Sequence, residues 1–187
     1  MRVIAGTARS MPLKTVKGMD TRPTQDRIKE TLFNVIQADV PGALFLDLFA
    51  GSGAIGIEAL SRGASGAYFV ENSKPAIECI KENLIFTKLD DRADVMECDA
   101  VTAINRLSGK GVFDVVHMDP PYGMGYEKQV LEALLRAGIV DDYTTVIIEA
   151  SLDTDFSYVD SLGYSIIKQK NYKNNKHVFL RVNGGSN

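Results

Sequence analysis

The residues best suited to chemistry are four acids that lie inside or just after strand-like apolar runs: Asp47, Glu71, Asp99 and Asp119. Asp119 opens the sequence Asp119-Pro120-Pro121-Tyr122. Because proline fixes the φ angle, two prolines predict a rigid loop that holds the Asp119 carboxylate and the Pro120 carbonyl in place. Both groups accept hydrogen bonds, and the Tyr122 ring offers a flat stacking surface. The loop therefore presents two fixed acceptors beside an aromatic ring.

Asp47 lies within the stretch Leu44–Gly53, which reads Leu-Phe-Leu-Asp-Leu-Phe-Ala-Gly-Ser-Gly. Its apolar start predicts a strand that is covered on both faces. Gly51 and Gly53 lack a Cβ, so the backbone can turn tightly there and lie close to a ligand. A helix expected over Ala54–Arg62 would point free N–H groups at the same place. We predict a small-molecule cradle at the carboxyl end of this strand.

The spacing Gly51-x-Gly53-x-x-Gly56 also matches the dinucleotide fingerprint, which is a weak signal by itself. Glu71 follows the expected strand Ala67–Val70, 18 residues beyond Gly53. That is close to the separation of about 20 residues expected for an acid that binds ribose hydroxyls. Asp99 ends the expected strand Ala93–Asp99, where it could accept a hydrogen bond from an adenine amino group. The alternative for Glu71 is a helix-capping or surface acid, and the alternative for Asp99 is an acid in a surface turn.

The rest of the pattern predicts an α/β sheet with helices on both faces, preceded by a small hairpin and closed by an antiparallel one. Thr24 is expected to cap the first helix, whose apolar stripe would be Ile28, Leu32, Val35 and Ile36. We interpret His117 as a buried core histidine and not as a catalytic one. The other expected elements are hairpin strands 2–5 and 13–16, helices 25–37, 75–86, 103–107 and 126–137, and strands 113–118, 145–150, 163–170 and 177–182.

Composition excludes several classes of protein. A chain of 187 residues is long enough for one domain with a sizeable core. No apolar run reaches the roughly 18 residues of a membrane helix, so we expect no membrane contact. Cys79 and Cys98 have no metal-ligand spacing and there are two histidines, so we expect no metal site. The two thiols are expected to be free, in a reducing cytoplasm.

The net charge of −3 hides an uneven distribution. Residues 1–30 hold seven Lys and Arg against three acids, and residues 168–187 hold five against none, so these ends carry +4 and +5. Residues 31–167 hold nine against 21 and carry −12. The two basic ends either are ordinary solvated surface or lie together beside one active-site mouth and bind phosphates.

Two motifs together resemble those of S-adenosylmethionine-dependent methyltransferases that act on exocyclic amino nitrogens: Asp47-x-Phe49-Ala50-Gly51-Ser52-Gly53 and Asp119-Pro120-Pro121-Tyr122. From end to end the chain resembles the bacterial RsmD family, which methylates a guanine N2 in 16S ribosomal RNA. The pieces that distinguish this family are Arg22-Pro23-Thr24-x-Asp26 and Glu30-Thr31-Leu32-Phe33-Asn34. The chain departs from it at Ala8-Arg9-Ser10, where members often carry Arg-Gly-Arg.

The resemblance implies a class I, Rossmann-like methyltransferase fold with a seven-stranded, mostly parallel sheet. It implies one domain over 1–187, with a hairpin-and-helix appendage at 1–40 and a catalytic core at 43–183. Asp47, Gly51 and Gly53 would surround the methionine end of S-adenosylmethionine, Glu71 would hold the ribose and Asp99 the adenine, with Phe49, Asn72 and Ala100 beside them. The implied catalytic residues are Asp119, Pro120 and Tyr122, and the implied substrate-binding residues are Arg22, Thr24, Pro121 and Tyr122.

For Arg22, a structural ion pair with Asp20 or Asp26 is the alternative to a place at the mouth of the site. The implied partner is 16S ribosomal RNA within a small-subunit assembly particle, bound by a monomer in the cytoplasm. Methylation of DNA adenine N6 or of a protein glutamine stays open, since those enzymes use similar motifs. More distant alternatives are a nicotinamide-dependent oxidoreductase and a non-catalytic ribosome-assembly factor.

Overall fold

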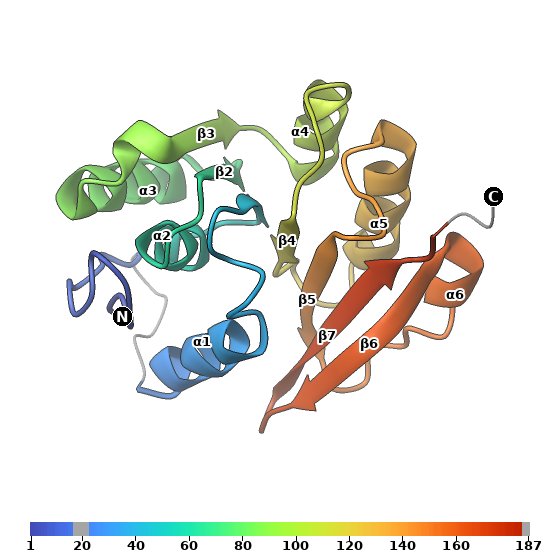
Figure 1. Cartoon of the computed structure of the whole chain (residues 1–187). Helices are drawn as coiled ribbons and strands as arrows, with labels where there is room; N and C mark the ends of the chain where they lie inside the picture. The colour runs from blue at the N-terminus through green and yellow to red at the C-terminus, as the bar shows by residue number, and fades with distance from the viewer. Residues whose placement is uncertain (17–22, 185–187) are drawn as a thin grey trace.

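The computed structural model describes residues 1–16 and 23–184, which contain a seven-stranded sheet of order β3-β2-β1-β4-β5-β7-β6 (Figure 1). The first five strands are parallel, whereas β7 runs antiparallel to both β5 and β6. The strands are β1 (Leu44–Leu48), β2 (Gly66–Glu71), β3 (Ala93–Glu97), β4 (Val115–Met118), β5 (Thr145–Ser151), β6 (Tyr164–Asn171) and β7 (Asn175–Val182).

Helices cover both faces of this sheet (Figure 1). One face packs against α1 (Pro23–Val35), α2 (Ala54–Ser61) and α3 (Lys74–Thr87), and the other against α4 (Ala100–Leu107), α5 (Tyr126–Ala137) and α6 (Val159–Leu162). A short 3-10 turn, Asp90–Arg92, precedes β3. Because side chains alternate along a strand, each core strand contributes residues to the hydrophobic clusters on both faces of the sheet. Phe45 packs on the side of α1–α3, and Leu46 packs on the side of α4–α6. Within the described ranges, no helix is long and apolar enough to cross a membrane.

The seven-stranded sheet and its closing antiparallel hairpin confirm the predicted fold class. One boundary moves because of a cap: Asp99 accepts a hydrogen bond from the Thr102 N–H at 2.9 Å, so α4 starts at Ala100 and not at Ala103. β3 accordingly ends at Glu97. The sequence pattern does not predict α6, because its four residues are too few to show a helical period.

The expected N-terminal hairpin is reduced to one antiparallel bridge between Arg2 and Pro12. Regular pairing stops because the next backbone donors bond to side chains. The N–H groups of Ile4 and Ala5 donate to the Glu58 carboxylate at 2.8 and 3.0 Å. The segment is therefore fixed onto α2 and does not form a free-standing pair of strands.

The first helix differs from expectation in two ways. It begins at Pro23, a residue well suited to the first helical position, so Thr24 lies inside its first turn and does not cap it. Its buried face includes Lys29 and Phe33 besides Leu32 and Ile36, whereas the expected stripe residues Ile28 and Val35 are only partly buried. The charged Lys29 is buried because its partner lies on another element.

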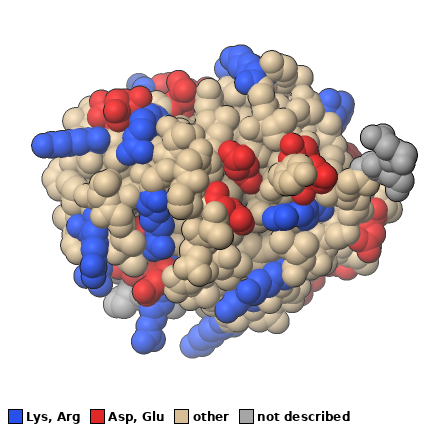
Figure 2. Space-filling model, viewed as in Figure 1, with Lys and Arg blue, Asp and Glu red and all other residues tan. Residues whose placement is uncertain are grey.

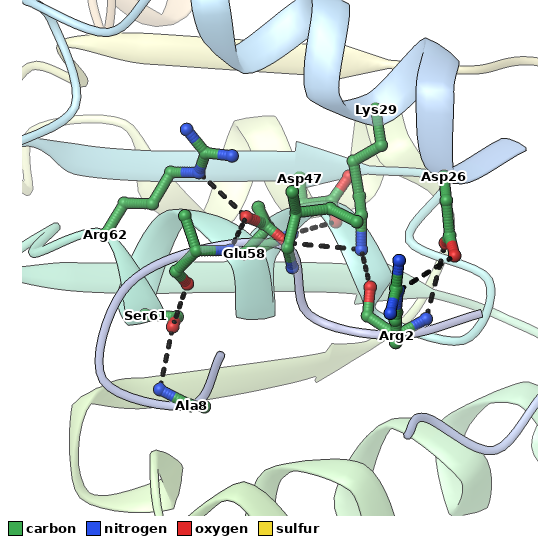
Figure 3. A network of polar contacts seen from close by, with 11 residues as sticks. Arg2, Ala8, Asp26, Lys29, Asp47, Glu58, Ser61 and Arg62 are labelled. Carbon is green, nitrogen blue, oxygen red and sulfur yellow. Dashed lines mark hydrogen bonds and ion pairs between the residues drawn. The ribbon is translucent and has the colours of Figure 1, made fainter. Parts of the chain in front are cut away.

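That partner is Glu58 on α2, whose side chain is fully buried (Figure 3). The Lys29 Nζ lies 3.2 Å from the Glu58 Oε2, and the Arg62 Nε donates to the Glu58 Oε1 at 2.7 Å. The Lys29 ammonium also donates to the Arg2 carbonyl at 2.6 Å. Two cations and two backbone N–H groups thus compensate one buried carboxylate, which joins the N-terminal segment, α1 and α2.

Candidate active site

The turn after β1 forms the cradle that the glycine pattern predicts. Gly51 and Gly53 have φ angles of 56° and 78°, in the left-handed region that favours glycine. Gly56 serves packing: a Cβ there would lie 2.3 Å from the ring of Phe69 on β2. The absent side chains therefore allow both the tight turn and the close approach of α2 to the sheet.

Phe49, at the start of this turn, is one of the few non-glycine residues with a positive φ, at 60°. A bulky residue is strained in this region. Its ring lies 5.8 Å from the ring of Tyr126, centroid to centroid. Such strain persists where the surroundings enforce it, and it is concentrated at ligand sites.

The Asp47 carboxylate stabilises the cradle through a hydrogen bond to the start of α2. It is 1% exposed, and its Oδ2 accepts a hydrogen bond from the Gly56 N–H at 3.0 Å. Its Oδ1 lies 3.1 Å from the His117 Nδ1 on β4. The carboxylate therefore fixes the first turn of α2 against the sheet. It lines the main pocket, but both of its oxygens already have protein partners.

Glu71 reinforces the same turn from β2. Its Oε2 accepts from the Gly51 N–H at 2.9 Å, and its Oε1 accepts from the N–H groups of Asn72 and Ser73 at 2.9 and 2.8 Å. A carboxylate offers about four acceptor positions, so capacity is left for a further donor. Glu71 and Asn72 both line the space in front of the cradle.

Two connected pockets open at the carboxyl ends of the parallel strands. The larger, about 700 Å³, lies between the cradle and the Asp119–Tyr122 loop, and the smaller is about 130 Å³. Both are lined by Phe49, Glu71, Asn72 and Pro121. Asp99 and Ala100 line the smaller pocket, where Asp99 also caps α4. Asp99 therefore lines the pocket and also caps a helix, a second role that the sequence pattern did not predict.

Asp119 lines the larger pocket together with the cradle residue Gly51. The residue is exposed to solvent, although the pocket wall covers part of it. This partial burial, together with the charge of Glu149, raises the pKa of Asp119 to about 7, although His117 opposes the shift. Tyr122 beside it is half exposed, and burial raises the pKa of its phenol to about 12, so it stays neutral.

His117 is buried as expected, but only one of its ring nitrogens has a partner. Its Nε2 is among the buried polar atoms that lack a hydrogen bond to the described residues. Burial alone would lower the pKa of His117, yet the hydrogen bond and charge of Asp47 outweigh it and raise the pKa. The residue lines the larger pocket, and the charge of Asp119 also helps to raise its pKa, so the interpretation as an ordinary core histidine is incomplete.

Sequence reasoning missed Glu149, which lies on β5 in the same pocket. The Asn175 side-chain amide donates to its Oε1, and the His177 Nε2 lies 3.3 Å from its Oε2. The available signal was one charge in the apolar run Val146–Ala150, where a buried strand needs none. The pocket is also lined by residues to which the sequence analysis gave no role in the site: Ile28, Lys29, Ser52 and Ile55.

The two basic ends of the chain meet beside this site. A groove of about 520 Å³ adjoins the larger pocket at Tyr122 and is lined by α1 on one side and by the turn between β6 and β7 on the other. Arg27 and Lys173 face it from these two segments. In Figure 2, basic side chains lie along the left and lower margins of the face shown, with several acids near its middle.

Two of the predicted substrate-binding residues, Arg22 and Thr24, are not described or are described only in part. Arg22 lies outside the described residues. Thr24 lies in the first turn of α1, and its side chain is outside the described part of the chain. By contrast, Pro120, Pro121 and Tyr122 all line the larger pocket.

The fold and its strand order define a class I methyltransferase fold, and solved structures agree. The yhhF protein of Escherichia coli superposes with a TM-score of 0.84 at 29% identity, covering 98% of each chain. A Thermus thermophilus protein, TTHA0928, superposes with a TM-score of 0.81 at 28% identity, covering 97% and 99%.

The chain belongs to the RsmD family. The family model described as Conserved hypothetical protein 95 matches residues 1–181. YlbH of Bacillus subtilis is 38% identical over 175 residues, covering 91% of this chain and 92% of YlbH. The ribosomal RNA small subunit methyltransferase D of Haemophilus influenzae is 31% identical over 171 residues, covering 91% and 88%.

Proposed function

We propose that this protein transfers a methyl group from S-adenosylmethionine to the N2 amino group of a guanine in small-subunit ribosomal RNA. The observation that carries the proposal is the position of the Asp119-Pro120 acceptor pair, across one pocket from the glycine cradle. The name of the Haemophilus influenzae relative supports the substrate class. We expect a cytoplasmic monomer that acts on an assembling small subunit.

The residues at the cradle fit S-adenosylmethionine. The larger pocket has a volume within the range of small-molecule sites. Glu71 has acceptor capacity for ribose hydroxyls, and Asp99 borders a small, mostly apolar pocket that suits a flat adenine ring. Gly51 lines the larger pocket and keeps the turn free of a side chain beside the methionine end, whereas a Cβ at Gly53 would meet Ile80 and Phe69 in the core. When bound, the cofactor supplies a methyl group attached to a sulfonium sulfur. After the transfer, that sulfur is part of a neutral thioether, which makes it a good leaving group.

The protein's own work is to position and orient the amino group. A guanine amino nitrogen is a poor nucleophile because its lone pair is delocalised into the ring. The Asp119 carboxylate and the Pro120 carbonyl accept its two N–H bonds, which favours a pyramidal nitrogen with its lone pair directed at the methyl group. Asp119 stabilises the positive charge that develops on nitrogen and takes the proton that leaves. Tyr122 stacks on the base, which must be unstacked to enter.

The groove beyond Tyr122 suits the RNA strand that flanks the target. It combines Arg27 and Lys173 with the half-exposed ring of Tyr122 and the partly buried ring of Tyr172. Basic side chains bind phosphates without reading sequence, and aromatic rings stack on neighbouring bases. The dinucleotide-oxidoreductase alternative leaves this groove and the Asp119 loop without a role.

Glu71→Ala should weaken cofactor binding. The substitution removes the acceptor proposed for the ribose and also releases the Gly51 N–H that shapes the cradle. We expect the Kd for S-adenosylmethionine to rise at least about tenfold, which corresponds to the loss of one charged hydrogen bond. Titration calorimetry measures it, and an unaltered Kd would remove Glu71 from the site.

Methyl transfer should depend on pH through Asp119. Its raised pKa means that the carboxyl is protonated below about pH 7 and then donates where the reaction needs an acceptor. We expect the single-turnover rate at subsaturating cofactor to rise about tenfold per pH unit up to about pH 7 and then to level off. A rate independent of pH between 5.5 and 8 would contradict an essential Asp119 carboxylate.

The proposed function is tested with tritiated S-adenosylmethionine and three substrates: undermethylated small-subunit particles, naked 16S RNA and duplex DNA. After digestion, the labelled nucleoside is identified. Label in N2-methylguanosine is the expected result, with particles compared against naked RNA for efficiency. Label in N6-methyladenine would keep the acceptor chemistry and overturn the guanine assignment. Confirmed cofactor binding without label in any nucleic acid would favour the protein-substrate alternative.

A further inference from the structure

We propose that Glu149 selects guanine over adenine by accepting the N1–H of the target base while Asp119 and Pro120 hold its N2 amino group. The inference rests on the proposed function and assigns a specificity-determining role to a residue that the motifs do not include. It is carried by the position of Glu149 in the sheet and by the side chains that hold it.

The sheet register places Glu149 next to Asp119. The last paired residues of β4 and β5 are Met118 and Ile148, and Asp119 and Glu149 follow them on their respective chains. Neighbouring strands lie about 4.8 Å apart, so Asp119 and Glu149 are adjacent residues at the carboxyl ends of their strands. Both line the larger pocket together with Pro120 and Tyr122. Their mutual effect agrees with this closeness, since the charge of Glu149 helps to raise the pKa of Asp119.

Glu149 is held in place as a charged acceptor. On β7, His177 is its direct cross-strand partner, with the His177 Nε2 at 3.3 Å from the Glu149 Oε2. The Asn175 amide donates to the other oxygen. Behind this pair, the ring of Tyr172 packs edge-on against His177 at 5.0 Å between centroids. Burial opposes the charge, but these donors outweigh it and lower the pKa of Glu149.

Two neighbouring carboxylates are best matched by a base edge that carries two adjacent donors. Guanine has such an edge, because its N1–H and its N2 amino group lie side by side and both donate hydrogen bonds. Adenine presents its N6 amino group beside N1, which is an acceptor. Its lone pair would face the Glu149 carboxylate, and neither group could supply a hydrogen. Sites built to bond a substrate N–H reject analogues that lack it far more strongly than apolar pockets reject a missing methylene.

The test uses RNA in which the target nucleotide is replaced. Once labelling has located the target, 16S RNA is assembled by ligation with either guanosine or 2,6-diaminopurine riboside at that position. The analogue keeps the N2 amino group but carries an acceptor at N1. We expect the intact protein to prefer guanosine by at least about 100-fold in kcat/KM.

Glu149→Gln should narrow that preference at least tenfold. Asn175 would keep the amide oxygen as its acceptor, so the new NH₂ takes the position beside the His177 Nε2. The neutral imidazole can accept one hydrogen of that NH₂ as its other tautomer, and the second hydrogen can be donated to the analogue's N1. Glu149→Asp keeps the charge and should retain the preference at a lower rate. Glu132→Gln, an exposed acid on α5, is the matched control and should change neither value. Thermal melts confirm that each variant is folded.

The outcomes separate this inference from the function on which it rests. If Glu149→Gln slows both substrates by the same factor, Glu149 only supports the fold of the pocket and the inference is wrong. The inference is equally wrong if the intact protein accepts guanosine and the analogue at the same rate. If the intact protein methylates neither RNA, whether naked or assembled into small-subunit particles, the proposed function itself fails and takes the inference with it.

Discussion

Asp119→Asn should lower the rate of methyl transfer about 10³-fold while the affinity for S-adenosylmethionine stays within a few-fold. The substitution keeps the size of the side chain and one acceptor oxygen, but it removes the negative charge beside the reacting nitrogen. Loss of a single electrostatic contact to a developing charge typically costs 10²–10³ in kcat. The loss should be larger here, because Asp119 also receives the departing proton.

Separate measurements of binding and rate distinguish this role from a structural one. Single-turnover kinetics at saturating cofactor report the chemical step, and calorimetry reports the Kd. Asp142→Asn, an exposed acid in the loop before β5, serves as the control. Turnover equal to that of the unsubstituted protein would rule out the proposed role of Asp119, whereas a Kd weakened as much as the rate would make it a binding residue.

The same substitution should stabilise the protein without substrate. The folded-state pKa of Asp119 is about 7, above its unfolded value, so the folded state binds more protons between pH 4 and 7 and this residue's contribution to stability falls as pH rises. The full shift would correspond to about 4 kcal/mol, but solvent reaches the carboxylate, so we expect about 1 kcal/mol at pH 8. A gain in stability with a loss of activity is typical of a residue kept for function.

The core of the fold could be predicted because its signals are local. Strands such as Val115–Met118 are continuous apolar runs, and glycines and prolines mark where they end. The sequence also indicated which acids would lie close together, because parallel strands bring their carboxyl ends to one edge of the sheet. Asp119, Glu71 and Asp99 follow such strand ends, and each lines one or both of the pockets at that edge.

What the sequence could not show depends on partners far along the chain. The burial of Lys29 requires Glu58, 29 residues away on another helix, and a helical pattern contains no sign of it. Likewise, Glu149 becomes a pocket residue only because β7 inserts beside β5 and supplies His177. The sequence also did not show that Asp47 and Glu71 fix the backbone of the cradle, whose N–H groups donate hydrogen bonds to their carboxylate oxygens.

Glu58→Ala should destabilise the protein by about 3–5 kcal/mol, because it leaves a buried cation without its counter-charge. Lys29 is 3% exposed and, among the residues that the structure describes, would keep the Arg2 carbonyl as its one hydrogen-bond acceptor. The N–H groups of Ile4 and Ala5 would lose their acceptor as well. For a domain stable by about 5–15 kcal/mol, this is a large fraction of the total.

A double-mutant cycle separates the unpaired charge from the lost hydrogen bonds. Lys29→Met in the Glu58→Gln background removes the buried cation, so the double variant should be more stable than the Glu58→Gln variant alone. Urea denaturation supplies the midpoints, and m-values show whether the compactness of either state has changed. If the two substitutions were simply additive, the ion pair would not be the source of the loss. Lys29 also lines the larger pocket, so this network connects the N-terminal segment to the candidate site.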